Sequence, residues 1–463
     1  MMTLQLLNMV VIARLLTPAE IGVFIIALSI VTIIQALREM GLTNYLIQAP
    51  AINDDTIRVT FGMSIVLCTG LGLALQLTRQ QVENWIGMPG LAQVLGPVVL
   101  VILIFPVEQP AMALIRREMR FDTLHHLTIL SKLAGVSTSI GLALWGFSTM
   151  ALVWGLVIEA LLRMILLAWA EPRHLLLGPS LRGWRPLLSF GAWTSGASLA
   201  GQATVEVTKL LIAGILGAGP TAIFDRAVRI PGMVRMGLFM PLGRVLLSSF
   251  SEDLRQGRPI GEKVSRLTGI TTGMVWPMFA ILALLSDEIV MLILGPQWSQ
   301  SAAILPWLLL AQSILSLLPQ PEQILVPFGH VRRLFAVRLF QLFASLSTTL
   351  IALQWSLEVF AMTRPLNTLI LIVAIWIAIS PYMGVSLREL AQGHLKSAIV
   401  TLVTCLPVAV WKFGGLGDGS QLVLVAMLIC AATLGIITLL TIKHPLGDEL
   451  KRASSWLRKR WQA

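Results

Sequence analysis

Charged residues are scarce in this sequence. Only 12% of its 463 residues are charged, 56% are hydrophobic, and the mean hydropathy is +0.82. A soluble domain carries about 25% charged residues, and a chain this apolar lacks the polar surface to cover a soluble core. The scarcity excludes an ordinary soluble fold and indicates an integral membrane protein.

The residue patterns of common catalytic and metal sites are also lacking. Three cysteines lie in apolar runs without ligand spacing, and six histidines are scattered, so we expect neither a disulfide framework nor a metal site. We find no nucleotide-binding glycine loop, serine-hydrolase elbow or zinc-protease motif. The N-terminus shows no signal-peptide pattern. We expect a protein that is not an enzyme and needs no cofactor.

Long apolar runs are what the sequence does contain. A helix needs about 20 mostly apolar residues to cross a bilayer, and these runs are too long and uniform for the alternating strands of a barrel. The predicted fold is all-α, with about 14 transmembrane helices. Their approximate spans are 1–16, 20–49, 57–78, 92–115, 123–146, 149–170, 186–217, 220–250, 264–285, 301–328, 334–357, 365–388, 396–411 and 420–442.

Lys and Arg in the loops and at the ends of these segments are distributed unequally between alternate sides. Loops after even-numbered segments, with the tail, hold 21 of them, and the opposite loops hold three: Arg79, Arg364 and Lys412. Cytoplasmic loops carry the excess of basic residues, so we predict a multi-pass bacterial inner-membrane protein with both termini in the cytoplasm. The net charge of +11 then reflects topology and contact with lipid headgroups, not nucleic-acid binding.

Two weak internal matches share one register. Residues 11–24 align without gaps on 211–224, and Glu108-Gln109 pairs with Glu322-Gln323. These matches relate segment 1 to 7 and segment 4 to 10. We therefore predict two six-helix halves in the same orientation, a parallel repeat known from transporters.

Several motifs, in order, resemble one family. They are Ala13-Arg-Leu-Leu-Thr-Pro-Ala-Glu-Ile-Gly22, Gly41-Leu-Thr-Asn-Tyr-Leu-Ile-Gln48, Arg117-Glu-Met-Arg-Phe121, Phe224-Asp-Arg-Ala-Val-Arg-Ile-Pro231 and Leu294-Gly-Pro-Gln-Trp298. The sequence resembles the polysaccharide transporter family of the multidrug/oligosaccharidyl-lipid/polysaccharide flippase superfamily. The resemblance implies two six-helix lobes, with helices 1, 2, 7 and 8 walling a central cavity. It also implies flipping of a polyprenyl-diphosphate-linked oligosaccharide for exopolysaccharide, capsule or O-antigen synthesis.

Domain boundaries follow from the repeat and the resemblance together. We expect an N-lobe over 1–170, a cytoplasmic linker over 171–185, a C-lobe over 186–389, two further helices over 390–443 and a basic tail over 444–463. The first segment is shorter than the first helix usual in the family, so we expect either a short first helix or a true start that lies upstream. The implied partners are the lipid-linked substrate, the bilayer, and polysaccharide polymerase and export machinery.

Charges inside the apolar segments are the candidate functional residues, because such charges face protein or a wet cavity. A guanidinium fork matches phosphate oxygens. For binding the diphosphate we select Arg226 and Arg229, aided by Arg38, Lys209 and Arg235. For ion coupling or charge neutralisation we select Glu39, Glu206 and Asp225.

Three further acids have other expected roles. Glu108 and Glu322 stand beside prolines at repeat-equivalent positions, and a proline frees a backbone carbonyl. They are candidates for hinges or for structural bracing. Glu159 and Arg163 are four residues apart, so we expect them to form an ion pair on one helix face, with a structural role.

Two other functions compete with a flippase. A multidrug exporter for cationic drugs would favour an acidic cavity, whereas segments 2, 7 and 8 supply five basic candidates against three acids. A membrane glycosyltransferase or polymerase usually needs a large non-cytoplasmic loop, and the predicted outward loops are short. A flippase working by alternating access therefore ranks first.

Overall fold

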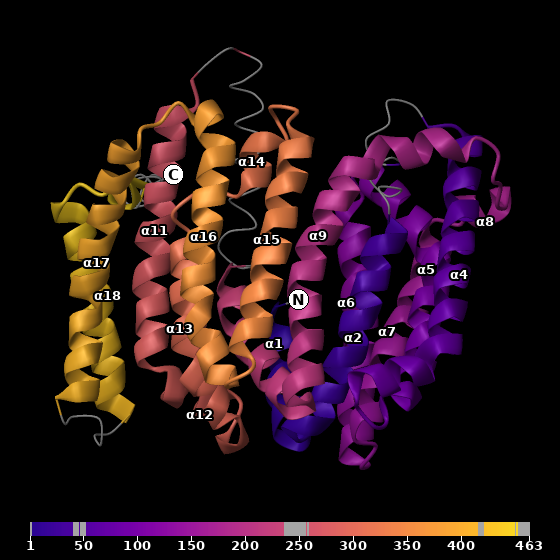
Figure 1. Ribbon diagram of the computed structural model, residues 1–463, viewed down its shortest axis with the longest axis horizontal. Helices are drawn as coiled ribbons and strands as arrows, with labels where there is room; N and C mark the ends of the chain where they lie inside the picture. Colours follow the sequence, from indigo (N-terminus) through magenta and orange to yellow (C-terminus); the bar gives the residue numbers. More distant parts are fainter. Residues whose placement is uncertain are drawn as a thin grey trace, which may run out of the picture. The chain divides into compact units, whose positions relative to one another are not determined.

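The computed structural model describes residues 2–39, 46, 52–235, 256, 259–414, 421–449 and 451. Over these residues every regular element is a helix (Figure 1). Eleven of the described helices are long and apolar enough to cross a membrane. This confirms the predicted all-α polytopic fold. The count of 14 spans is compatible with it and stays a prediction.

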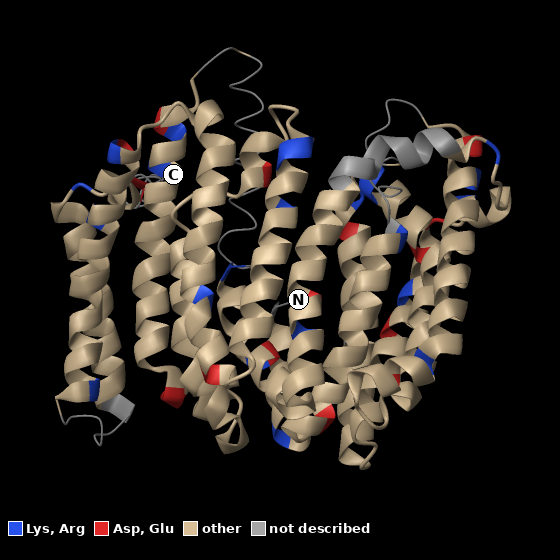
Figure 2. Cartoon of the chain, viewed as in Figure 1, with Lys and Arg blue, Asp and Glu red and all other residues tan. Residues whose placement is uncertain are grey.

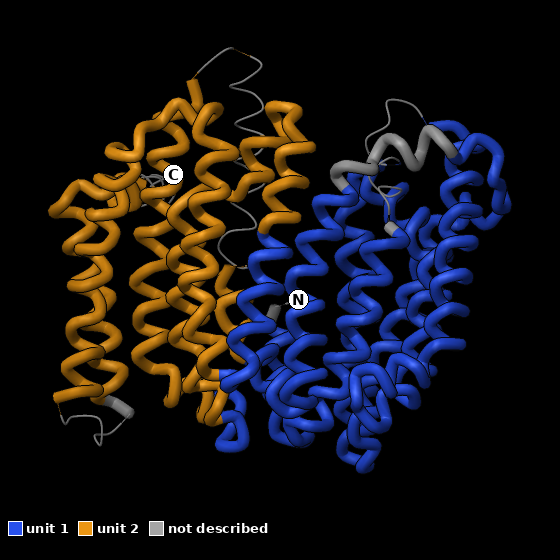
Figure 3. Tube along the Cα trace, viewed as in Figure 1, with its two compact units in different colours: residues 1–226, 293–298, 341–357 blue, residues 227–292, 299–340, 358–463 orange. Residues whose placement is uncertain are grey.

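The chain divides into two compact units (Figure 3). Unit 1 comprises Met1–Arg226, Ile293–Trp298 and Gln341–Leu357, and unit 2 comprises Ala227–Leu292, Ser299–Phe340 and Glu358–Ala463. The first boundary between the units lies at Arg226, after the predicted interlobe linker at 171–185. The helix that follows this linker, Trp184–Leu216, packs on helices of unit 1 and therefore belongs to that unit. The lobe boundaries expected from the repeat stay a prediction.

Unit 1 is built mainly from consecutive antiparallel helices. Its closest helix pairs are α6 with α7, α4 with α5, α5 with α7 and α2 with α9. The bounds are α1 Met2–Leu15, α2 Pro18–Glu39, α4 Asp54–Ile86, α5 Leu91–Arg117, α6 Phe121–Leu144, α7 Thr149–Ala170, α8 Arg173–Leu177 and α9 Trp184–Leu216, followed by helical residues 218–235 that run on into unit 2.

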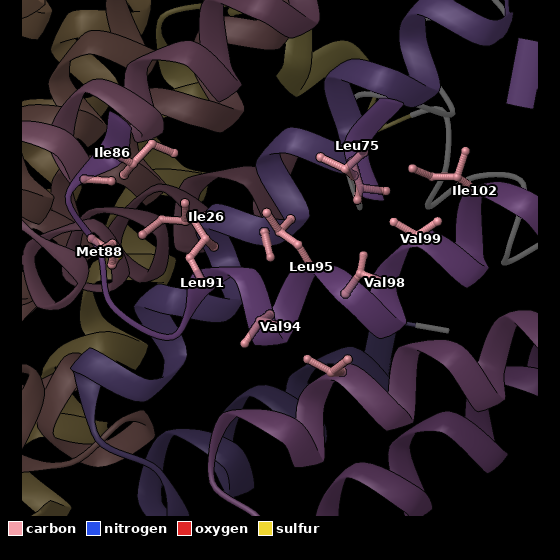
Figure 4. Close-up of a cluster of buried hydrophobic side chains, with 14 of the residues drawn as sticks. Ile26, Leu75, Ile86, Met88, Leu91, Val94, Leu95, Val98, Val99 and Ile102 are labelled. Atoms are coloured by element: carbon pink, nitrogen blue, oxygen red, sulfur yellow. The ribbon is translucent and has the colours of Figure 1, made fainter. Parts of the chain in front are cut away.

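The apolar core of unit 1 lies around α5. Leu91, Leu95, Val98 and Ile102 follow one another at helical spacing and are fully buried (Figure 4). Residues of α2 and α4 join them, among them Ile26. The helix is continuous although Pro97, Pro106 and Pro110 lie inside it, because packing on several neighbours holds it in place.

The corner between α1 and α2 explains one of the sequence motifs. Pro18 opens α2, and the backbone N–H and hydroxyl of Thr17 both donate to the Glu20 carboxylate over 2.8 Å. The Glu20 N–H donates back to the Thr17 hydroxyl. This capping box satisfies helix-end donors. The Thr-Pro-Ala-Glu sequence is therefore the start signal of α2.

Gly22 brings α2 close to the start of the helix over 218–235. A Cβ atom on Gly22 would lie 2.0 Å from the carbonyl oxygen of Ala218. Small residues allow such close backbone approach between membrane helices. The two stretches that match in sequence, 11–24 and 211–224, each contain a break between two helices, at 16–17 and at 217. They meet at this contact.

Unit 2 is built around α11, which packs on α13 and α17, while α17 packs on α18. The helix bounds are α11 Gly261–Leu284, α12 Ser286–Ile293, η1 Pro296–Trp298, α13 Ser299–Leu315, α14 Pro321–Leu325, α15 Val331–Ala352, α16 Leu357–Met383, α17 Leu387–Phe413 and α18 Gln421–Thr441. The unit boundaries fall within α12 and α15, and η1 belongs to unit 1. Charges on α17 lie toward its ends, and α18 has none (Figure 2).

Contacts between loops agree with the predicted alternation of the spans. Within each unit, polar contacts join loops that are expected on the same side, such as Arg173 with Asp54 at 2.7 Å and Lys412 with Asp287 at 3.3 Å. The side that faces the cytoplasm stays a prediction from the charge count. Some basic residues counted as loop residues lie inside helices, among them Arg79 in α4, Arg364 in α16 and Lys412 in α17, because these helices extend beyond the predicted spans.

His444 joins the end of α18 to α11 and α17. Its Nδ1 accepts the Leu446 N–H at 3.1 Å, so the proton is on Nε2, which donates to the Ser397 hydroxyl at 3.0 Å. The Ser397 hydroxyl also bonds Thr272 on α11 at 2.8 Å. Burial, with the nearby Lys396 charge, lowers the pKa of His444 to about 4. The neutral ring is therefore the form that holds these three elements.

Replacing Gly22 by Ala should lower the stability of the protein, because the added methyl group would force the two helix ends apart. We expect a loss of about 1–3 kcal/mol, measured as a lower midpoint of thermal unfolding in detergent. Gly70→Ala in α4 is the matched control, since nothing lies within 4 Å of its added Cβ. Equal midpoints for the two variants would contradict the close contact.

Acidification should destabilise the protein through His444. The unfolded pKa is near 6.5 and the folded pKa is about 4. The unfolded chain therefore binds more protons between these values, and stability falls as pH falls from about 6.5 to 4. A His444→Asn variant should lose this part of the pH dependence of the unfolding midpoint. An unchanged slope in the variant would assign the dependence to other groups.

Candidate functional site

One basic and two acidic side chains meet inside unit 1. The Lys209 ammonium lies 3.0 Å from the Glu206 carboxylate and 3.2 Å from that of Asp225. The side-chain exposures of Lys209, Glu206 and Asp225 are 12%, 11% and 4%. A lone charge at this depth would be costly, whereas an ammonium between two carboxylates is compensated. We refer to these residues as the Lys209 cluster.

The turn at Gly217 assembles the Lys209 cluster. Gly217 has φ +95° and ends α9, and the chain continues as the helix over 218–235. Lys209 and Asp225 lie equally far before and after Gly217 in the sequence. In a helical hairpin, residues equally distant from the turn face one another. The sequence-based prediction selected all three residues but did not place Lys209 between the acids. Equal spacing about Gly217 was the signal it missed.

Arg226 follows directly on the same helix. It is buried, and its guanidinium lies over the Trp298 ring, 5.7 Å from the ring centre. A cation over an indole face is stabilised by the ring electrons. Arg229 and Arg235, selected for the same role, are exposed residues of this helix and belong to unit 2.

Arg38 on α2 lies against α5. Its guanidinium stacks on the Phe105 ring, 3.2 Å from the centre, and Nη1 donates to the Ile102 carbonyl over 3.4 Å. The side chain is 3% exposed. These contacts are with the packed interior of unit 1. The side chain of Glu39, the neighbouring candidate, lies outside the described residues.

Glu108 on α5 is held by a second ionic network. Arg163 on α7 donates to both carboxylate oxygens of Glu108, each over 3.1 Å. Arg163 also lies 3.5 Å from Glu159, which confirms the expected pair, and Glu159 lies 3.4 Å from Lys132 on α6. The four charges balance across three helices. This arrangement favours bracing for Glu108, and a hinge role stays a prediction.

Unit 2 holds the repeat-equivalent acid, Glu322. It lies in the short helix α14, after a break in the helix at 316–320, and forms an ion pair with Arg338 on α15. Arg364, with its guanidinium 5.4 Å from the Phe360 ring centre, is a cation in the candidate membrane-spanning helix α16, whereas the sequence pattern placed it in a loop. It was missed because Pro365 was read as the start of the helix.

The Arg163–Glu108 pair should be essential for stability. Arg163→Ala would leave Glu108 buried without its bidentate partner, at a cost of about 3–5 kcal/mol. Adding Glu108→Gln should restore much of this loss, because the uncompensated charge is then removed. The check is a double-mutant cycle of unfolding midpoints in detergent. Additive effects of the two changes would contradict a direct pair.

Comparison with known proteins agrees with the motif resemblance. The family model described as "Polysaccharide biosynthesis protein" matches residues 11–303. Lipopolysaccharide biosynthesis protein WzxC of Escherichia coli (strain K12) is 23% identical, over 97% of this chain and 92% of that protein. Succinoglycan biosynthesis transport protein ExoT of Rhizobium meliloti (strain 1021) is 24% identical, over 68% of this chain and 63% of ExoT.

The fold also has a solved relative. The structure of lipid II flippase MurJ in an inward closed conformation aligns with a TM-score of 0.71, at 12% identity, over 95% of this chain and 96% of MurJ. At this identity the likeness shows a shared fold. Since the family model covers more than half of the sequence, the chain belongs to the "Polysaccharide biosynthesis protein" family.

Proposed function

We propose that this chain is a flippase that moves a polyprenyl-diphosphate-linked oligosaccharide across the cytoplasmic membrane, for the synthesis of a cell-surface polysaccharide. The observation that carries this proposal is the pair of interior cations at one helical hairpin of unit 1, the buried Arg226 and the partly buried Lys209. Similarity to WzxC over nearly the whole chain supports the substrate class. Similarity to the fold of MurJ supports the type of protein.

A diphosphate carries adjacent negative charges that need cations wherever they leave water. Arg226 offers a planar fork that can bind two phosphate oxygens and keeps its charge at any physiological pH. Lys209 offers a point charge that Glu206 and Asp225 hold in this state. We expect the diphosphate to take Lys209 from its carboxylates, which would then take up a proton or a cation.

The remaining candidates belong to the same proposal. Arg38, Arg229 and Arg235 would guide the diphosphate along its path, and Glu39 would contribute to charge balance. Transport would proceed by alternating access between two lobes with the termini on the cytoplasmic side. The product would pass to polysaccharide polymerase and export machinery.

A multidrug exporter is the alternative within transporters. Cationic drugs would be repelled by buried guanidinium groups, and the Lys209 cluster neutralises much of the acid that such drugs would need. Substrate charge separates the two functions: the flippase binds a polyanion and the exporter binds cations.

Arg226 gives the cleanest test, because replacing Lys209 would also remove the cation that lies between two carboxylates. Arg226→Lys keeps the charge but loses the fork, so glycan export should fall about ten-fold, the effect of one lost charge-assisted bond. Arg226→Gln should lower export further. Export is measured in a strain without its own flippase, at matched protein level in the membrane.

The matched control is Arg58→Gln, which removes an exposed arginine from the first turn of α4. It should leave export unchanged. Full export by the Arg226→Gln variant would exclude a charge role at this position.

A further inference from the structure

The segment Ile293–Trp298 belongs to a different compact unit from the residues on either side of it. These six residues belong to unit 1, whereas Leu292 before them and Ser299 after them belong to unit 2. Leu294 and Trp298 are fully buried. Gly295, with φ +100°, turns the chain, and Pro296–Trp298 form a single 3₁₀ turn. A short excursion that buries Leu294 and Trp298 in this way requires a specific partner in unit 1.

That partner is the C-terminal end of α1. The indole N–H of Trp298 donates to the Ala13 carbonyl over 2.9 Å. The amide of Gln297 donates to the Leu16 carbonyl over 3.2 Å and also to the Ala13 carbonyl. Two adjacent side chains therefore bind the end of one short helix, at Ala13 in its last turn and at Leu16 directly after it.

The α1–α2 corner creates the need for these donors. Carbonyls in the last turn of a helix have no partner within the helix. The Thr17 N–H, which would otherwise bond Ala13, donates to Glu20 instead. The Glu20 N–H, the corresponding donor for Leu16, bonds the Thr17 hydroxyl. The capping box of α2 thus leaves both carbonyls open for Gln297 and Trp298.

Trp298 also contacts the candidate binding residue. Its ring lies beneath the Arg226 guanidinium, and its N–H is fixed on Ala13. One side chain therefore connects the end of α1 with the helix over 218–235. A shift of α1 would change the support of Arg226, and a shift of Arg226 would act on the indole that holds α1.

The contacts are suited to reversible release. They are side-chain hydrogen bonds to helix-end carbonyls, which exchange for water at a modest net cost because water replaces each lost partner. The covalent chain on both sides of the segment belongs to unit 2. Movement of α12 or α13 in unit 2 would therefore pull directly on Gln297 and Trp298.

We propose that Gln297 and Trp298 are positioning residues of the transport cycle, forming a latch that holds the α1–α2 corner and Arg226 in the state described here. Release of Ala13 and Leu16 frees α1 and removes the ring beneath Arg226. This role rests on the proposed function, in which Arg226 binds a diphosphate.

Accessibility of Leu16, which is 4% exposed, tests the latch without reference to transport. Leu16→Cys is introduced into a chain whose three native cysteines are replaced, and its labelling by a maleimide is followed in nanodiscs. The double change Gln297→Leu and Trp298→Phe removes both donors and keeps an aromatic ring. We expect labelling to be at least about five-fold faster, because the loss of a single hydrogen bond already corresponds to about this factor.

Trp276→Phe is the matched control. The Trp276 indole N–H donates to the Ser313 carbonyl over 2.9 Å within unit 2, so its loss removes the same kind of bond elsewhere. The control should leave labelling of position 16 unchanged. Unchanged labelling in the double variant, or an equal increase in the control, would overturn the latch. Size-exclusion profiles confirm that each variant is folded.

A cross-link between α1 and the latch segment tests whether the latch must open during transport. Leu15→Cys and Pro296→Cys, both at exposed positions, are joined by a cleavable bifunctional thiol reagent, and transport of a polyprenyl-diphosphate-linked oligosaccharide is measured in proteoliposomes. Transport should stop when the reagent is attached and recover when it is cleaved. Undiminished transport by the cross-linked protein would overturn the proposal. Failure of the unsubstituted protein to transport would instead count against the proposed function, while the labelling experiment still decides whether the latch exists.

Discussion

The cost of a charge in hydrocarbon governs the interior of this protein. Hydrophobic residues between membrane helices gain little from leaving lipid, so packing and polar pairing hold such helices together. Glu108 is therefore bound at both oxygens by Arg163, and Lys209 lies between Glu206 and Asp225. The Glu108–Arg163 and Lys209–Asp225 pairs join different helices. The charges are both the means by which the helices recognise one another and the groups through which a charged substrate could act.

The two networks of unit 1 differ in a way that bears on function. The Glu108 network is balanced, with two acids and two bases spread over α5, α6 and α7. Arginine in bidentate geometry is difficult to displace. The Lys209 cluster instead holds a single ammonium between two acids, beside the indole-supported Arg226. A point charge with flexible geometry exchanges partners more readily. The first network is suited to bracing and the second to binding.

Local sequence signals predicted much of the fold. Long apolar runs predicted the helices, the Thr17–Glu20 spacing explains the start of α2, and the four-residue spacing predicted the Glu159–Arg163 pair. Contacts between distant residues could not be predicted in this way. Arg163 reaches Glu108 from another helix, and Trp298 reaches Ala13 from the far part of the chain. Hydropathy and helical period carry no information on which faces of different helices meet.

Direct transport by the purified protein tests the central claim, that buried cations let this chain carry a diphosphate across a bilayer. The protein is reconstituted with a polyprenyl-diphosphate-linked oligosaccharide in both leaflets, and an impermeant glycosidase is added outside. The claim predicts that the protein brings inner-leaflet substrate to the enzyme, and that a monophosphate-linked analogue is moved more slowly. Digestion confined to the outer leaflet, as in protein-free vesicles, or equal rates for the two lipids would contradict it.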